Sequence, residues 1–163
     1  MVAQILSMME KVLFLKKVSL FSELNSDILI AIAEVAEERD WNEKEVIFRE
    51  NESGDTLYLI VFGEVEISIT PQNSQKRVLN IAKSTEIFGE MSLFDSSPRS
   101  ATAIAAKPVK LLALRKNQFR DLISEYPEIM FEMYRIAIER LRKADKHVTD
   151  NSPQNNSSTN GTN

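Results

Sequence analysis

The sequence has no cysteine and only one histidine, His147. Without cysteine the chain can form no disulfide, and it offers no thiolate nucleophile, no cysteine-ligated zinc and no iron–sulfur site. A single histidine supplies neither a second metal ligand nor a nucleophile with its base. These absences argue against catalysis and against a metal or other cofactor, and they suit a reducing compartment. We therefore predict a non-enzymatic, cytoplasmic protein.

The sequence also lacks a long hydrophobic run and an excess of positive charge. In the opening stretch no basic residues precede the apolar part, and Glu10 and Lys11 interrupt it before it reaches the length of a signal-peptide core or a membrane span. The net charge is −4 and the isoelectric point is about 5.2. A broad cationic surface for a phosphate backbone is therefore not expected. We predict neither a membrane nor DNA as a partner.

Composition and length indicate one globular domain with a tail. The chain has 163 residues, of which 43% are hydrophobic and 27% charged, a mixture that is typical of a domain with a single core. Residues 149–163 contain no apolar side chain to bury, so they are predicted as a disordered polar tail. The domain is predicted over residues 1–148, with a roll at about 40–115 and helices at about 4–38 and 116–148.

The hydrophobic pattern changes from helical to strand-like and back along the chain. Apolar residues recur at helical spacing before about residue 38, and Asn25 offers an N-cap for a second helix. The helical period returns after the roll and is broken near Pro127. We predict a mainly β fold with flanking α-helices: a double-stranded, jelly-roll-like β-roll with N-terminal helices and a C-terminal helix pair. Six short strands are predicted, at KEVIF, TLYLIVF, EVEISIT, RVLNIA, ATAIAA and VKLLAL.

A glycine separates the second and third predicted strands. Gly63-Glu64 has the residue order of a two-residue type II′ turn, in which the first central position requires glycine. The pattern therefore predicts a hairpin between these two strands.

The segment from Phe88 to Thr102 carries the strongest indication of chemistry. Gly89 allows the backbone to approach a ligand closely, and the amides that follow would start a short helix directed at an anion. Pro98 fixes the backbone ahead of Arg99. The planar guanidinium of Arg99 can hold a phosphate through two parallel charged hydrogen bonds, each contributing about 1.5–3 kcal/mol when shielded from water. This combination predicts a phosphate site.

A carboxylate and small residues complete the predicted site. Glu90 only accepts hydrogen bonds when ionised, so beside a phosphate it suits a sugar hydroxyl. Ser100 and Ala101 leave room for the ligand, and their backbone amides can complete the cradle. The predicted ligand is therefore an anion that bears a hydroxyl group. The predicted ligand-binding residues are Gly89, Glu90, Met91, Ser92, Arg99, Ser100 and Ala101.

The motif F-G-E-M-S-L-x4-P-R-S-A-T resembles the phosphate-binding cassette of the cyclic-nucleotide-binding family. This family includes bacterial catabolite activator proteins and the regulatory subunits of cyclic-AMP-dependent protein kinase. The resemblance implies a ligand held inside a β-roll. It also implies that Glu90 binds the ribose 2′-hydroxyl, that Arg99 binds the cyclic phosphate, and that Gly89, Ser100 and Ala101 supply close backbone contacts.

The resemblance extends over about residues 10–148, with departures at turns. Asn51 stands where the family usually has a glycine, and Lys83 and Thr85 stand where turn glycines are common. Asn tolerates left-handed backbone geometry, but β-branched Thr tolerates it poorly. The roll is therefore expected to differ locally at the second of these turns.

The predicted function is that of a regulatory module that binds cyclic AMP or cyclic GMP and signals to a partner by conformational change. After Val148 only the polar tail follows, without the helix-turn-helix of catabolite activators, so a stand-alone domain is expected. Its output would pass to a protein partner or through a homodimer formed by the closing helix. One alternative is a degenerate roll that binds a protein and needs no nucleotide. The least favoured alternative is an enzyme that acts on a cyclic nucleotide.

Overall fold

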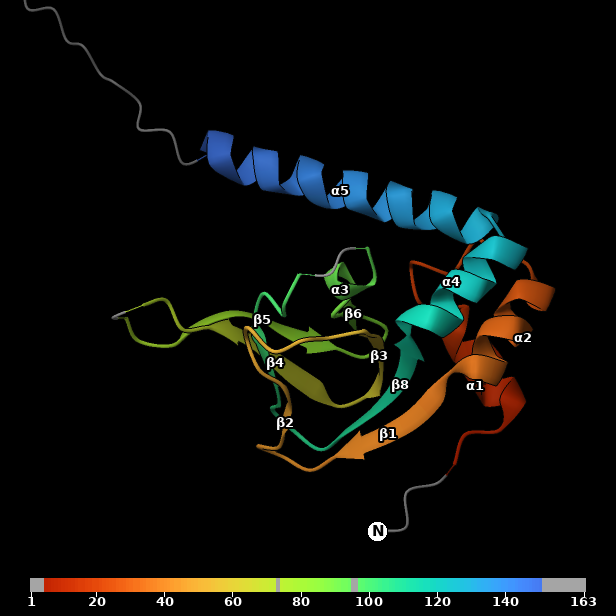
Figure 1. Ribbon diagram of the computed structural model, residues 1–163, viewed down its shortest axis with the longest axis horizontal. Helices are drawn as coiled ribbons and strands as arrows, with labels where there is room; N and C mark the ends of the chain where they lie inside the picture. The colour runs from red at the N-terminus through yellow and green to blue at the C-terminus, as the bar shows by residue number, and fades with distance from the viewer. Residues whose placement is uncertain (1–4, 73, 95–96, 151–163) are drawn as a thin grey trace, which may run out of the picture.

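The computed structural model describes residues 5–72, 74–94 and 97–150 (Figure 1). Two four-stranded antiparallel sheets form a roll, with strand orders β1-β8-β3-β6 and β2-β7-β4-β5. Figure 1 shows α1, α2 and α4 gathered at one end of the roll, with α5 extending from α4. The predicted β-roll with flanking helices is confirmed. In chain order the elements are α1 (Met8–Leu15), α2 (Ser26–Val35), β1 (Glu37–Trp41), β2 (Val46–Phe48), β3 (Thr56–Phe62), β4 (Glu64–Ile69), β5 (Arg77–Lys83), β6 (Ile87–Phe88), α3 (Met91–Phe94), β7 (Thr102–Ala105), β8 (Val109–Arg115), α4 (Lys116–Glu125) and α5 (Glu128–Asp150).

The helices begin and end at residues suited to those positions. The Asn25 side chain accepts a hydrogen bond from the Ile28 amide at 3.0 Å, which confirms the predicted cap of α2. Helices α4 and α5 are separated at Pro127, as the pattern predicts. Helix α5 is described as far as Asp150, two residues beyond the predicted helix. From residue 151 onward the predicted tail lies outside the described residues.

The described residues contain eight strands, two more than the sequence pattern predicts. Strand β1 begins at Glu37, where the pattern predicts the end of a helix. Residues of β1 pair with β8 from Glu37 opposite Ala113 to Trp41 opposite Val109. This long-range ladder overrides the local helical preference. Strand β6 has only two residues, too few to show a period.

The predicted hairpin at Gly63 is wrong, although the glycine itself is needed there. Strand β3 pairs with β6 and β8, whereas β4 pairs with β5 and β7, so Gly63 marks the point where the chain passes from one sheet to the other. Gly63 has a φ of +93°, and a Cβ at this position would lie 2.2 Å from the carbonyl oxygen of Pro108. Alternating strands joined by a glycine look the same in sequence whether they form a hairpin or this corner.

The two faces of β3 belong to two different cores. Leu57 and Leu59 pack with the helices in one cluster, while Tyr58 and Ile60 face the interior of the roll in a second cluster. Burial on both faces explains why this strand is a continuous hydrophobic run rather than an alternating one. The strand therefore joins the helical end of the domain to the inside of the roll.

The two turns at which the resemblance implies glycine keep left-handed geometry without it. Asn51 has a φ of 68° and Thr85 a φ of 73°. At the second turn the Thr85 amide donates to the Ile60 carbonyl at 2.8 Å, and the Glu86 amide donates to the Lys83 carbonyl at 3.0 Å. The tertiary hydrogen bond holds β-branched Thr85 in a conformation that it disfavours. The turn therefore forms in spite of Thr85, and the expected local difference is backbone strain at this residue.

Replacing Thr85 by glycine is expected to stabilise the domain by about 0.5–1 kcal/mol. The substitution relieves about 1–2 kcal/mol of left-handed strain and increases the entropy of the unfolded chain by somewhat less. Asn51→Gly is the matched control and should change the free energy of unfolding by only a few tenths of a kcal/mol, because Asn tolerates this geometry. Urea denaturation of both variants measures the effects. Equal stability of Thr85→Gly and the parent chain would contradict the strain.

Candidate functional site

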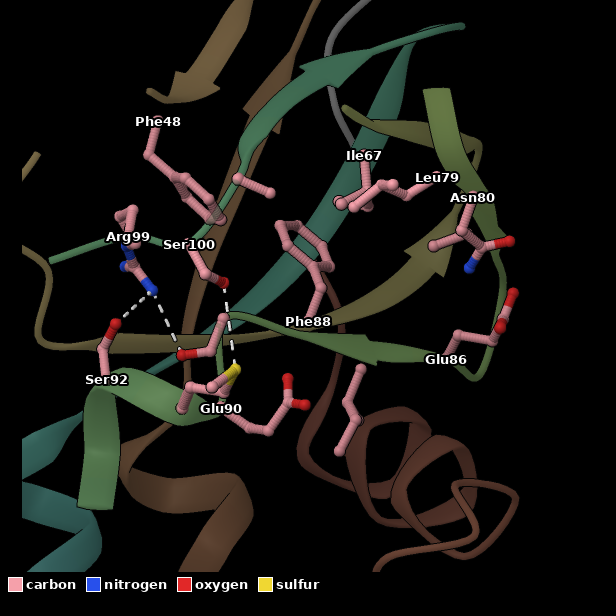
Figure 2. A pocket seen from close by; sticks show the side chains of 15 residues that line it. Phe48, Ile67, Leu79, Asn80, Glu86, Phe88, Glu90, Ser92, Arg99 and Ser100 are labelled. Atoms are coloured by element: carbon pink, nitrogen blue, oxygen red, sulfur yellow. Dashed lines mark hydrogen bonds between the residues drawn. The ribbon is translucent and has the colours of Figure 1, made fainter. Parts of the chain in front are cut away.

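A cavity of about 390 Å³ opens inside the roll, and all seven residues predicted to bind ligand line it (Figure 2). They come from the segment that runs from the end of β6 through α3 to the start of β7. The residues of the sequence motif therefore lie around one cavity in the structure. The role of each residue stays a prediction. The cavity is also lined by Phe48, Ile67, Leu79, Asn80, Ala82, Glu86, Ile87 and Phe88.

The guanidinium of Arg99 is held inside the domain by backbone and hydroxyl oxygens. The side chain is only 5% exposed. Its Nη1 donates to the Gly89 carbonyl at 3.1 Å and to Ser92 Oγ at 3.2 Å, and its Nη2 donates to the Thr56 carbonyl at 2.9 Å. Within the described part of the chain, no carboxylate lies within the 4.0 Å of an ion pair with it. The buried cation therefore forms no ion pair with a carboxylate of those residues.

Phe48 and Gly54 shape the space around this guanidinium. The Cζ atom of Arg99 lies 4.1 Å from the centre of the Phe48 ring, a cation–π contact. A Cβ on Gly54 would lie 2.1 Å from Arg99 Nε and 2.5 Å from its Cζ, so only glycine leaves room there. Nε itself is buried and finds no acceptor among the described residues. Both residues lie more than 40 positions before Arg99 in the sequence, and no local signal identifies them.

The electrostatic environment favours an anion next to Arg99. Burial is the largest influence and lowers the pKa of the guanidinium, while nearby acidic groups, Tyr58 and Asp55 foremost, raise it. An arginine stays charged under such influences because its ordinary pKa is so high. A buried positive charge costs free energy unless an opposite charge or strong hydrogen bonds compensate it. A bound anion would supply that compensation.

Hydrogen bonds and a glycine fix the backbone at Arg99 and at Gly89. Gly89 has a φ of +77°, and a Cβ on it would lie 2.7 Å from Arg99 Nη1, so glycine is needed there for backbone and for space. The predicted short helix follows as α3, in which the Leu93 amide donates to the Glu90 carbonyl at 3.0 Å. The Arg99 amide donates to the Glu52 carbonyl at 2.8 Å. The guanidinium therefore projects from an anchored main chain.

The other predicted residues surround the same part of the cavity. Glu90 is half-buried, and its side chain extends away from Arg99 in Figure 2. The exposed Ser100 hydroxyl donates to the Met91 sulfur at 3.8 Å, and Ala101 is buried. The side chains of Arg99 and Glu90 thus point to different parts of the cavity.

The opposite end of the cavity contains polar residues that the sequence pattern did not identify. Figure 2 shows Asn80 and Glu86 at the far end from Arg99, with the apolar side chains of Phe88 and Leu79 between the two ends. The cavity is therefore polar at both ends and apolar in the middle. No motif contains Asn80 or Glu86, because their place in the cavity depends on how strands fold together.

Glu86 also borders a second space. A groove of about 320 Å³ is formed between α5, the turn that contains Thr85 and the segment that follows α1. The α5 side chains that border it are Ile136 and Glu139. Arg135 of the same helix donates from Nη2 to the Ser19 carbonyl at 3.1 Å. Glu86 thus stands between the cavity and α5.

Two other kinds of feature are absent from residues 5–72, 74–94 and 97–150. In these ranges no group of three or more His, Cys, Asp or Glu side chains is placed to hold a metal ion. Nor do they include a helix with the length and apolar character needed to cross a bilayer.

Known proteins resemble the chain in sequence and in fold. A CRP-like cAMP-activated global transcriptional regulator of Mycobacterium tuberculosis is 27% identical over 136 residues, which cover 83% of this chain and 61% of the relative. A cyclic nucleotide-gated potassium channel of Rhizobium etli is 37% identical over 123 residues, covering 76% of this chain and 33% of the channel. The chain thus spans about three fifths or less of the length of these relatives.

A solved structure and a family profile agree with these relatives. The crystal structure of the Thermus thermophilus catabolite activator protein superposes with a TM-score of 0.74 and 32% identity, covering 80% of this chain and 62% of that one. The profile of the cyclic nucleotide-binding domain matches residues 38–126, more than half of the chain, and this stretch includes the roll, the cavity and Arg99. The chain belongs to the cyclic nucleotide-binding domain family.

Proposed function

We propose that the chain is a regulatory module that binds a cyclic mononucleotide, cyclic AMP or cyclic GMP, in the cavity of the roll. The observation that carries the proposal is the state of Arg99, a buried cation that lines the cavity and forms no ion pair with a described carboxylate. Phe48 and Gly54 hold its guanidinium in a narrow space. A singly charged cyclic phosphate supplies the missing negative charge through paired hydrogen bonds.

The remaining residues have distinct roles in this proposal. Glu90 accepts a hydrogen bond from the ribose 2′-hydroxyl, and Ser100 and Ala101 provide the backbone cradle beside the phosphate. Ser92 holds Arg99 from behind, since its hydroxyl already accepts from Nη1. These groups bind and orient a ligand, and the proposed role is accordingly binding without catalysis. The names of the relatives, a cAMP-activated regulator and a cyclic nucleotide-gated channel, support this ligand class.

The signal is proposed to leave the domain through α5, to a second copy of the chain. Met130, Tyr134 and Leu141 are 41–67% exposed. Their spacing of four and seven residues is typical of a seam between paired helices. A ligand transmits a signal only if it binds two states of the domain with different affinities. Closure of α3 over the ligand and movement of α5 are the proposed difference between these states.

Titration calorimetry with cyclic AMP and cyclic GMP tests the proposal. At least one nucleotide should bind with micromolar or tighter affinity, and Arg99→Ala should weaken binding at least about a hundredfold, because it removes two charged hydrogen bonds. Arg99→Lys keeps the charge but loses the paired geometry, so its affinity should lie between those of the parent chain and Arg99→Ala. Arg49→Ala, which removes an exposed arginine outside the cavity, is the matched control and should bind as the parent chain does.

Thermal unfolding shows whether each variant is folded before it is titrated. Sedimentation of the same samples should show a dimer. If neither nucleotide gives heat or a thermal shift at millimolar concentration, the proposal is wrong. The better account is then a roll that binds a protein partner without nucleotide.

A further inference from the structure

Asn80 and Glu86 form a polar end of the cavity that the phosphate and ribose contacts leave unused. Arg99 lies at the opposite end, and Phe88 and Leu79 line the space between (Figure 2). A nucleotide whose phosphate contacts Arg99 has its base as the part farthest from that contact. The flat faces of the base suit the apolar middle of the cavity, and the polar edge of the base then lies next to Asn80 and Glu86.

Asn80 and Leu79 both line the cavity from β5, next to a β-bulge. In the ladder between β4 and β5, Ile67 is opposite Asn80 and Ser68 is opposite Val78, so Leu79 is an extra residue on β5. In a regular strand neighbouring side chains point to opposite faces, yet Leu79 and Asn80 both line the cavity. Bulges redirect side chains in this way and are frequent beside functional sites. Asn80 shares the cavity face of the strand with Ala82, two residues on, and the bulge turns Leu79 to the same face. The amide of Asn80 is thus a polar group in an otherwise apolar part of the wall.

A strained turn places Glu86. Its carboxylate Oε2 accepts from the Lys83 amide at 2.6 Å, and the turn contains Thr85 with a φ of 73°. Strained backbone persists where the surrounding structure holds it, often at functional sites. The hydrogen bond orients the carboxylate but occupies only one of its about four lone pairs, so both oxygens can still accept from a ligand.

We propose that Asn80 and Glu86 recognise the edge of the base and select guanine over adenine, an inference that rests on the proposed nucleotide binding. Guanine presents the O6 acceptor beside the N1–H and N2–H donors. The Asn80 amide can donate to O6, while the Glu86 carboxylate accepts from both donors in a paired, charge-assisted contact. Adenine instead has an unprotonated N1, which sets a lone pair against the carboxylate. The preferred ligand is therefore cyclic GMP.

Affinities of three cyclic nucleotides test this selection. Cyclic GMP should bind about tenfold more tightly than cyclic AMP. A buried charged contact would give a larger ratio, but Glu86 is exposed and water weakens the contact. Cyclic IMP keeps O6 and N1–H but lacks the 2-amino group, so its affinity should lie between the other two. Competition against one fluorescent cyclic nucleotide ranks all three on the same protein.

Substitution of Glu86 ties the selection to its carboxylate. Glu86→Gln keeps an oxygen that can accept from the Lys83 amide, so the turn is preserved, but it replaces the second acceptor by a donor. We expect the preference for cyclic GMP over cyclic AMP to disappear, mainly through weaker binding of cyclic GMP. Asn80→Ala should also reduce the preference for cyclic GMP over cyclic AMP. Glu43→Gln, at an exposed glutamate outside the cavity, should leave the preference unchanged.

The outcomes separate this inference from the function on which it rests. If cyclic AMP binds as tightly as cyclic GMP or more tightly, or if Glu86→Gln keeps the parent preference, base selection by this end of the cavity is wrong. Binding that is lost in Arg99→Ala would still support the proposed function in that case. If no cyclic nucleotide binds, both proposals are wrong.

Discussion

Gly54→Ala is expected to lower the affinity for cyclic nucleotide about a hundredfold while the domain stays folded. The new methyl group would lie 2.1 Å from Arg99 Nε, 2.5 Å from Cζ and 2.8 Å from Cδ, so the guanidinium must leave its position against Phe48. Gly54 is not among the glycines with positive φ, so the backbone itself accepts alanine. Only the end of a side chain has to move, and the expected loss of folding free energy is about 1 kcal/mol. Titration calorimetry and urea denaturation measure the two effects.

The neighbouring Ser53→Ala variant is the control for Gly54→Ala. Ser53 is exposed and does not line the cavity, so its affinity for nucleotide and its stability should match those of the parent chain. An unchanged affinity in folded Gly54→Ala would mean that nucleotide binding does not depend on the position of the Arg99 guanidinium. A variant of Gly54 that loses several kcal/mol would show instead that the guanidinium cannot move.

Phe21→Ala is expected to have the largest effect on stability, a loss of about 3–5 kcal/mol. Phe21 is fully buried, with 0% exposure, between α1 and α2 in the sequence. It belongs to the core cluster that includes Leu57 of β3 and Leu112 of β8, and therefore joins the helices to the back of the roll. Truncation removes the burial of the ring and leaves a cavity that rigid strands cannot fill. Urea denaturation followed by circular dichroism measures the change in the free energy of unfolding.

Phe131→Ala provides the same substitution on the surface. Phe131 is 75% exposed on α5, so its replacement should change the free energy of unfolding by less than about 0.5 kcal/mol. A loss of less than about 1 kcal/mol in Phe21→Ala would mean that the helices contribute little to the core of the roll.

The part of the site that the sequence predicts is the part formed by consecutive residues. Residues 88–92 and 99–101 line one side of the cavity, and their glycine, carboxylate, guanidinium and small residues can be recognised from their order alone. Phe48, Gly54, Asn80 and Glu86 come from other strands and turns. Their positions depend on pairing between distant segments. The neighbouring Leu79 also depends on a bulge that no local pattern reveals.

The fold shows the same division between local and long-range information. The cap at Asn25 and the break at Pro127 are local, and both are confirmed. Strand β1 and the corner at Gly63 depend on which distant strand becomes the partner, and there the sequence pattern predicts a helix and a hairpin instead. Sheet partners are chosen by burial of whole strands, which a short window of sequence does not contain.

Glu86 and Ile87 line both the cavity and the groove beside α5, so the two spaces share a wall. On one side this wall faces the end of the cavity opposite Arg99, and on the other it faces Ile136 and Glu139 of α5. If a base binds at Glu86 as proposed, the side chains that contact it also border α5, which gives the proposed signal a short route from the ligand to the helix.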